Sequence, residues 1–317
     1  MTDTTYGEAA AKLPLFRIRE VRAKQELHDA LSEDRSYAAY ALGHLEPGLF
    51  KRSRFWVAEG ERGTAVVLPA TAIGRTLIVG GAPEGVDAIL SLHPGARITN
   101  LTTAAPEHLP ALKRTYALSD TLHMQRMTVT QHSFAPVEGA LQRLRGSDLR
   151  QLNALYAIEG RPSYYTQNHI EHGVYYGTFE ERQLVSVAGT HIVAPHVGIA
   201  VVGNVFTHPA HRGRGLATRV TSRVTGELLA MGCPLVTLTV DPDNTPAVRA
   251  YHRLGYAPGA RVIEAQARRR DLIGVSAAVR RWAARRRGTA RSEHGTEYAT
   301  GLRPDDTGPD PDEGASP

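Results

Sequence analysis

The stretch "NVFTHPAHRGRGLATRV", residues 204–220, joins a β-branched run to a helical pattern through a turn of glycine and arginine. The run that leads into it, "IAVVGNVFT", is typical of a buried strand. After the turn, apolar residues recur every four positions, the spacing of one helical face, at Leu216, Val220, Val224 and Leu228. The first N–H groups of a helix have no intrahelical partner, and the helix dipole is positive there. The stretch therefore predicts an anion site, and pyrophosphate is its natural ligand.

The residues of this turn favour one kind of phosphate site and exclude two others. Gly213 and Gly215 allow the backbone to approach phosphate oxygens, and Arg212 and Arg214 add positive charge. A Walker-type loop would need Gly-Lys-Ser/Thr, which is absent here. The dinucleotide-binding fingerprint would need a third glycine where Thr218 stands and an acid about 20 residues further on. Neither nucleotide-binding pattern is met.

Length and composition limit the classes of protein to which the chain can belong. The length of 317 residues favours two domains. The one cysteine, Cys233, cannot form an internal disulfide, and no apolar stretch has the length of a signal peptide or a membrane span, so we expect a cytoplasmic protein. His208 and His211 flank Pro209 in what is best interpreted as a surface turn, and we expect no metal there.

The charge is concentrated in the C-terminal region. Residues 268–291 contain nine Arg and one Asp, whereas residues 293–317 contain seven acids and one Arg. We expect a basic amphipathic helix at 268–287 and a disordered acidic tail at 288–317. A narrow apolar stripe would dock this helix on its own domain, with the arginines solvated, through Leu272, Val275, Val279 and Trp282. Nucleic acid or a membrane surface is therefore the less favoured partner of the helix.

The rest of the chain reads as two similar halves. Residues 131–139 combine Pro, Gly and polar residues without periodicity, so they form the best candidate linker. Residues 140–267 predict the order helix, β-hairpin, strand, helix, strand, helix, strand. Residues 50–130 repeat this order of strands and helices. We expect an N-terminal domain at 1–136 and a second domain at 140–267.

Two motifs in the second half carry a resemblance. The pattern Arg/Gln-x-x-Gly-x-Gly/Ala is met by Arg212, Gly215 and Ala217. The pattern Asn-x-x-Ala-x-x-x-Tyr-x-x-x-Gly-aromatic follows and is met by Asn244, Ala247, Tyr251, Gly255 and Tyr256. Together, over residues 140–267, they closely resemble the GNAT superfamily of acetyl-CoA-dependent N-acetyltransferases. The resemblance implies an α/β (α+β) fold with a mixed central sheet flanked by helices, here as two similar domains in tandem.

The resemblance also implies a cofactor geometry. The strand end would offer backbone groups to the pantetheine arm and the acetyl carbonyl, at Val205, Phe206 and Thr207. Pyrophosphate would be held with Arg212 by the turn and helix start, at Gly213, Arg214, Gly215, Leu216, Ala217 and Thr218. Asn244 would contact the arm of acetyl-CoA. Tyr251 would place its hydroxyl near the sulfur and protonate the departing thiolate, since tyrosine titrates near ~10 and a thiol near ~8.5.

The general base and the acceptor stay open. Many members of the family carry a carboxylate on the strand that leads to acetyl-CoA, but "VGIAVVGNVFT" contains no acid, and Asn204 cannot act as a base. The remaining candidates, besides solvent, are Glu171, His169, His172 and His191. Residues 163–176 hold four tyrosines and two histidines, which suit either a pocket for a small organic acceptor or a half-buried packing layer.

The N-terminal half is expected to be a degenerate copy. Its counterpart of the turn, "VGGAPEGVDAIL" at 79–90, has Pro83 and Glu84 where basic residues would be needed. An acid at that point opposes pyrophosphate, so we expect acetyl-CoA only in the C-terminal half. The sequence thus predicts an N-acetyltransferase that moves an acetyl (acyl) group to a small amine, with a non-catalytic acyl-CoA-binding module as the alternative. It leaves acyl chain length and oligomeric state open.

Overall fold

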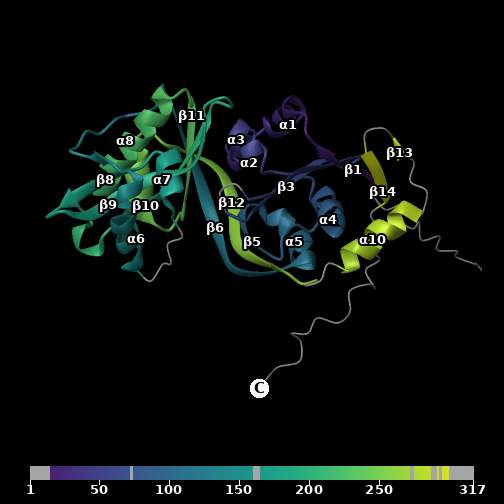
Figure 1. Cartoon of the computed structure of the whole chain (residues 1–317). Helices are drawn as coiled ribbons and strands as arrows, with labels where there is room; N and C mark the ends of the chain where they lie inside the picture. Colours follow the sequence, from purple (N-terminus) through teal and green to yellow (C-terminus); the bar gives the residue numbers. More distant parts are fainter. Residues whose placement is uncertain are drawn as a thin grey trace, which may run out of the picture.

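One continuous mixed sheet runs through both halves of the chain. The computed structural model describes residues 15–71, 74–159, 165–271, 275–286, 291–292 and 295–299. Within these residues the strands form a single 14-stranded sheet in the order β13-β14-β1-β2-β3-β4-β5-β12-β6-β11-β10-β9-β8-β7. Helices flank it in two groups, one for each half, and the long strands β6 and β12 lie between the groups (Figure 1). The predicted α/β class with a mixed sheet is confirmed.

From Phe55 onward the N-terminal half follows the order that its sequence predicts, and one strand and three helices that were not predicted precede it. Its elements are β1 (Leu15–Val21), α1 (Lys24–Leu31), α2 (Ala39–Gly43), α3 (Pro47–Phe50), β2 (Phe55–Gly60), β3 (Gly63–Ala70), β4 (Thr76–Gly81), α4 (Pro83–Leu92), β5 (Ile98–Thr103), η1 (Pro106–His108), α5 (Leu109–Thr115) and β6 (Tyr116–Thr130). Strands β4 and β5 are parallel, as expected for strands joined by a helix.

The C-terminal half confirms the predicted element order. Its elements are β7 (Gln142–Arg143), η2 (Gly146–Asp148), α6 (Leu149–Ala157), α7 (Gln167–His172), β8 (Tyr176–Glu180), β9 (Gln183–Ala194), β10 (Ile199–Thr207), η3 (Pro209–His211), α8 (Leu216–Ala230), β11 (Leu235–Val240), α9 (Thr245–Arg253) and β12 (Ala257–Arg269). The turn between β8 and β9 places Glu181 and Arg182 at positive φ, the geometry of a two-residue hairpin.

The last strand of each half pairs with a strand of the other half. Strand β12 lies beside β5 of the N-terminal half, and β6 lies beside β11 of the C-terminal half, both antiparallel. The two exchanged strands also pair with each other along most of their length. Read inward from β1 or from β7, the sheet therefore has the same sequence of elements and a pseudo-twofold relation at its centre (Figure 1). The halves form a tandem pair. Because β6 and β12 are exchanged, dividing the chain at any one residue would leave the sheet of each half incomplete.

A shared core joins the halves. One apolar cluster combines residues of α1, α2 and the N-terminal strands with Ile192, Ala194, Ile199 and Val201 of β9 and β10. Gly43 of α2 allows this contact, because a Cβ there would lie 2.5 Å from Cγ2 of Ile192. Helices α4 and α5 pack on a second cluster, and α8 and α9 pack on a third. Helix α2 of the N-terminal half thus supports the strand that carries the opening turn.

The C-terminal region departs from three expectations. Strand β12 continues to Arg269, and the basic helix α10 (Val275–Arg286) begins later than predicted. Val279 and Trp282 are 54% and 55% exposed, so the expected apolar docking stripe is wrong for both; α10 docks instead through buried Ala277. Leu272 and the side chain of Val275 lie outside what the structure describes.

Part of the expected tail is a strand. Residues 291–292 form β13 (Arg291–Ser292), and β14 (Gly295–Ala299) pairs antiparallel with β1. The expectation of disorder from residue 288 onward is therefore wrong for these residues, since β1 offers them a free sheet edge. Residues 288–290 and 300–317 lie outside the described ranges. Among the helices that the structure describes, none combines the length and the apolar character that crossing a bilayer requires.

Candidate active site

The strand before the opening turn separates from its parallel neighbour. Strands β10 and β11 pair only at their starts, from Ile199 with Leu235 to Val201 with Thr237. From Val202 to Thr207 no ladder bond to β11 is described, so this edge of β10 borders an opening. On its other edge, β10 pairs with β9, with a register shift between Gly203 and Phe206. The predicted residues Val205, Phe206 and Thr207 lie in this part of β10, where the Thr207 carbonyl accepts from Nε of Arg212 at 3.2 Å.

The loop below this opening is rich in free amides. Gly213 and Gly215 have φ of +78° and +73°, and a Cβ at either would meet open space. Within the described chain, no group accepts a hydrogen bond from the main-chain N–H of residues 213–218. The loop runs into the N-terminus of α8, whose dipole adds positive potential. The segment predicted to hold pyrophosphate thus carries main-chain N–H groups that have no acceptor in the described structure.

The two arginines of the loop are not free charges. Arg214 pairs with Glu180 at 2.8 Å, and His211 contacts the same carboxylate at 3.2 Å. The Arg214 hydrogen bond holds the pKa of Glu180 below its usual value. Arg212 pairs with Glu159 and donates from Nε to the Thr207 carbonyl at 3.2 Å. Both arginines are thus paired with carboxylates at the surface, and their contribution to pyrophosphate binding stays a prediction.

Helix α9 brings the second motif toward the same opening. Oδ1 of Asn244 accepts from the Ala247 N–H at 3.3 Å and so caps the helix, while the Asn244 side chain stays exposed. Tyr251 is 7% exposed and shares one apolar cluster with Val202, against which Val205 packs. Burial raises the pKa of Tyr251 to about 12. Its hydroxyl is therefore protonated throughout the neutral range.

Asn204 is the centre of a tyrosine cluster that sequence reasoning missed. It has φ of +57°, the left-handed region that asparagine tolerates better than most residues. Its Nδ2 donates to the Tyr175 hydroxyl at 3.1 Å, and its Oδ1 accepts from Tyr165. The Tyr156 hydroxyl donates to the Asn204 carbonyl. The signal was available: an asparagine after Gly203 interrupts an otherwise apolar strand.

Burial makes these tyrosines poor bases. It raises the pKa of Tyr165 to about 12, and raises the pKa values of Tyr156 and Tyr175 further. Tyr156 and Tyr165 stack with ring centroids 5.1 Å apart, and Phe206 of β10 lies 5.6 Å from Tyr156. An aromatic wall thus extends from β10 toward α6, on the predicted acceptor side. Tyr164, also in the predicted stretch, lies outside the described residues.

The four candidate bases have other roles in this structure. Glu171 accepts from the Gly146 N–H at 2.5 Å and caps η2, and His172 contacts the Asn168 carbonyl at 3.0 Å. His169 completes a capping box with Thr166. The His191 ring lies against Gly203 and 6.0 Å from Tyr40. The His191 side chain is exposed at the surface.

The corresponding opening in the N-terminal half is filled by side chains. Strands β4 and β5 pair only from Thr76 to Ile78 and then diverge. Into this space Tyr37 donates to the Val79 carbonyl at 2.8 Å. Nδ1 of His108 accepts from the Ala105 N–H at 2.9 Å, so Nε2 carries the proton and donates to the Gly81 carbonyl at 2.9 Å. His108 is 1% exposed and links the ends of the diverging strands.

Neither the turn nor the rest of the described structure forms a metal centre. Nδ1 of His208 accepts from the Ala210 N–H at 3.1 Å, and His211 belongs to the ion pair with Glu180. Within the described ranges, no three His, Cys, Asp or Glu side chains converge as metal ligands would.

Comparison with known proteins identifies the fold and the family of this site. A GCN5-related N-acetyltransferase from Kribbella flavida superposes with a TM-score of 0.50 at 18% identity, covering 73% of this chain and 95% of that one. A protein from Drosophila gives a TM-score of 0.57 at 14% identity, covering 79% and 98%. Both likenesses extend well beyond the C-terminal half. The sequence model of the acetyltransferase (GNAT) family matches residues 142–256, so the chain carries a domain of that family, built around β10 and α8.

Proposed function

We propose that the C-terminal half transfers an acetyl (acyl) group from acetyl-CoA to the amine of a small acceptor. One observation carries the proposal: the unpaired edge of β10 leads directly into six successive free amides at residues 213–218. An edge of this kind can pair with an amide-containing arm, and such amides suit a pyrophosphate. Acetyl-CoA has both groups in that order along its length.

Each predicted residue has a place in this binding mode. The main chain of Val205, Phe206 and Thr207 would pair with the pantetheine arm and orient the thioester carbonyl. Residues 213–218 would hold pyrophosphate by backbone alone, because Arg212 and Arg214 are already paired with carboxylates. Asn244 uses Oδ1 for its helix cap, which leaves Nδ2 to donate to the arm.

The reaction needs few protein groups. The amine nitrogen attacks the thioester carbon, a C–N bond forms, and a main-chain N–H of β10 stabilises the developing oxyanion. The C–S bond then breaks, and the thiolate accepts a hydrogen bond and a proton from Tyr251, which solvent re-protonates. Since burial raises the pKa of Tyr251 to about 12, hydrogen bonding to sulfur is the larger part of its effect.

The amine proton leaves through solvent in this scheme. Raised pKa values make Tyr156, Tyr165 and Tyr175 unsuited to accept it at neutral pH. Their rings instead form an acceptor-side wall, which supports a small organic amine as the substrate. Because no enzyme group takes this proton, the rate should follow the fraction of the amine that is unprotonated.

Binding and turnover test the proposal in two steps. Isothermal titration with acetyl-CoA should show one site per chain at sub-millimolar concentration, and absence of binding there would contradict the proposal. Free CoA thiol should then be released faster than in buffer when hydroxylamine or small primary amines are added. The alternative, a non-catalytic acyl-CoA-binding module, is favoured by the absence of a carboxylate on β10 and predicts binding without thiol release.

A further inference from the structure

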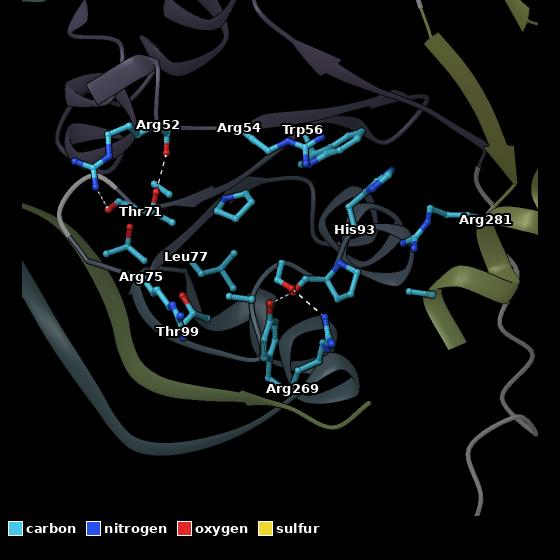
Figure 2. A pocket seen from close by; sticks show the side chains of 18 residues that line it. Arg52, Arg54, Trp56, Thr71, Arg75, Leu77, His93, Thr99, Arg269 and Arg281 are labelled. Carbon is cyan, nitrogen blue, oxygen red and sulfur yellow. Dashed lines mark hydrogen bonds between the residues drawn. The ribbon is translucent and has the colours of Figure 1, made fainter. Parts of the chain in front are cut away.

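A second cavity lies at the opposite end of the N-terminal strands. It has a volume of about 450 Å³ and is bordered by the starts of β4 and β5, the segment after α4, the end of β12 and helix α10 (Figure 2). The filled opening of this half lies where β4 and β5 end, so the cavity is separate from it. It belongs to the other half of the molecule from the loop at residues 213–218. Nothing in the proposed acyl transfer uses it.

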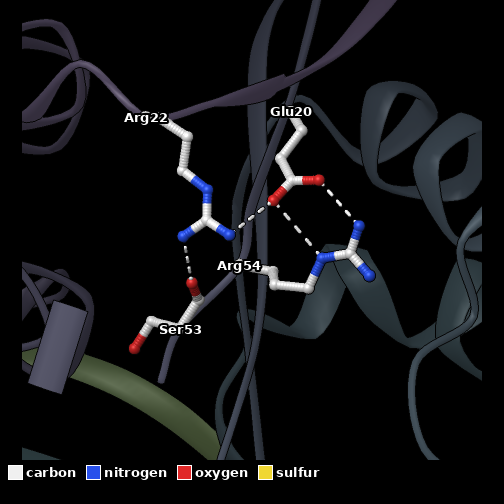
Figure 3. Close-up of polar contacts among 4 residues, drawn as sticks. All are labelled: Glu20, Arg22, Ser53 and Arg54. Carbon is white, nitrogen blue, oxygen red and sulfur yellow. Dashed lines mark hydrogen bonds and ion pairs between the residues drawn. The ribbon is translucent and has the colours of Figure 1, made fainter. Parts of the chain in front are cut away.

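The cavity is lined by cations without acids. Its charged lining consists of Arg52, Arg54, Arg75, Arg269 and Arg281, and no Asp or Glu lines it. Arg54 is neutralised from outside by Glu20, which it contacts at 2.7 Å and which Arg22 also contacts at 2.9 Å (Figure 3). This pairing holds the pKa of Glu20 below its usual value. Arg54 therefore contributes little net charge to the cavity.

The other four arginines are not neutralised, and main-chain carbonyls position three of them. Arg269 donates to the carbonyls of Gly95 at 3.0 Å and Asp271 at 2.7 Å. Arg281 donates to the Leu92 carbonyl, and Arg52 to the Thr71 carbonyl at 3.2 Å. In the part of the chain that the structure describes, none of the four forms an ion pair with a carboxylate. Carbonyls orient a guanidinium without cancelling its charge, so the four repel one another and favour an anion between them.

Two further groups define what the anion should look like. Thr76 is among the lining residues, but its hydroxyl is buried away from the cavity. Trp56 stacks on His93 with ring centroids 3.4 Å apart, and Arg54 lies over the Trp56 ring at 5.4 Å. Desolvation and Arg281 lower the pKa of His93 to about 4, so this ring is neutral at pH 7. The wall beside the arginines is therefore flat, aromatic and uncharged.

We propose that this cavity binds a small molecule that carries a phosphate group. Several unpaired guanidiniums match a dianionic phosphate better than a single carboxylate, because phosphate accepts bidentate hydrogen bonds from more than one arginine. The volume leaves room for an organic portion beside Trp56 and His93. This ligand site is independent of the acyltransfer proposed for the C-terminal half.

Fluorescence of Trp56 in the full chain tests the site. The chain has two tryptophans, so the Trp282→Phe variant leaves Trp56 as the only one. Titration with inorganic phosphate and with glucose 6-phosphate should give a saturable change, with a dissociation constant below ~1 mM for at least one of them. Acetate and chloride at equal ionic strength should give no saturable change. A response to chloride or acetate equal to that of phosphate would overturn the proposal, as would no saturable response to either phosphate compound.

A matched pair of variants locates the binding. Arg75→Gln should weaken phosphate binding at least tenfold, and because Arg75 is exposed and makes no described side-chain hydrogen bond, the variant should fold normally. Arg97→Gln removes the same charge from an exposed neighbour that does not line the cavity, and it should bind within twofold of the parent protein. Arg75→Gln that binds as the parent does, or Arg97→Gln that loses binding equally, would show that the cavity is not the site.

Discussion

The two halves of this protein share one topology but treat its central opening in opposite ways. In each, a parallel strand pair separates after three residue pairs. In the C-terminal half the separated edge stays open and leads into a loop of free amides. In the N-terminal half Tyr37 and His108 bond to the same kind of edge from inside the protein. Both halves therefore share the strand separation, and they differ in the side chains that bond to its edge.

The turns that follow β10 and β4 also differ in the hydrogen-bond donors and charges that they offer to an anion. The C-terminal loop has glycines at positive φ and free N–H groups. Its N-terminal counterpart begins α4 with Pro83, which has no N–H to offer, and with Glu84, which Arg62 pairs and whose carboxylate pKa is held low. A carboxylate at a helix start competes with any phosphate for the same dipole. The N-terminal half contributes α2 to the shared core and strand β6 to the sheet of the other half.

The largest expected effect is on turnover when Tyr251 loses its hydroxyl. Tyr251→Phe should leave acetyl-CoA affinity nearly unchanged, because the ring still packs in its apolar cluster. Turnover should fall by ~10² to 10⁴, the usual contribution of a positioned acid. Thiol release on an amine that gives measurable wild-type activity is the measurement. A rate within about threefold of wild type would show that another group assists the leaving thiolate.

Tyr37→Phe is the matched control in the other half. It removes a hydroxyl that donates to the main chain of β4, the counterpart of β10. Turnover should stay within about threefold of wild type, and the loss should appear only in stability, by about 1 kcal/mol. If both phenylalanine variants reduced turnover equally, the distinction between the halves would fail.

The next largest effect is on stability when the N-terminal opening is emptied. His108→Leu removes the side-chain partner of the Ala105 N–H and of the exposed Gly81 carbonyl, which should cost about 1–3 kcal/mol. Urea unfolding measures this loss. Binding of acetyl-CoA should remain at one site per chain, because Glu84 still occupies the helix start. If calorimetry finds a second acetyl-CoA site in this variant, then His108 alone prevents acetyl-CoA from binding to the N-terminal half.

A smaller effect is expected on affinity from the C-terminal loop. Gly215 has positive φ, so Gly215→Ala should distort the amides and weaken acetyl-CoA binding by about 10- to 100-fold. Gly232→Ala places the same residue at φ of +92° with equally open space, at the end of α8. It should cost similar stability and leave affinity unchanged. Titration calorimetry of both variants shows whether affinity is lost because the loop is distorted or because of backbone strain at any glycine of positive φ.

The smallest expected effect is the pH dependence of the scaffold. His93 titrates near 6.5 when unfolded and near 4 when folded, so the unfolded chain binds more protons between these values. Its contribution is complete above pH 6.5 and should decline by about 1–2 kcal/mol as pH falls toward 4. Urea midpoints between pH 4.5 and 7.5 measure this slope. His93→Gln should flatten it, and an unchanged slope would assign the dependence to other groups.

Local patterns predicted the elements well, but not the partners of their side chains. Most strands and helices from Phe55 onward followed from periodicity, whereas β1 and helices α1 to α3 were not predicted. The turn at Gly213 and Gly215 followed from its composition. The exchange of β6 and β12 could not be foreseen, because pairing between distant strands leaves no local signal. For the same reason the carboxylates that neutralise Arg212 and Arg214 were missed: Glu159 and Glu180 lie far from them in sequence.

Other features depended on the whole fold. The cavity at Trp56 combines the starts of three strands with the end of β12, so its arginines are scattered along the sequence. The pairing of β14 with β1 overrides the disorder that composition predicted, because a free sheet edge stabilises even a polar strand. The tyrosines around Asn204 were noticed as an aromatic stretch, but Tyr156 on α6 joins them only through the tertiary fold.

Hydrogen exchange in the full chain, with and without saturating acetyl-CoA, tests the contrast between the halves most directly. The six amides at residues 213–218 have no acceptor in the described structure, so acetyl-CoA should slow their exchange, together with that of the β10 edge at 202–207. Peptides that cover residues 79–92 should exchange at the same rate in both states. Protection confined to residues 202–218 is the predicted result, and equal protection at 79–92, or none at 213–218, would contradict it.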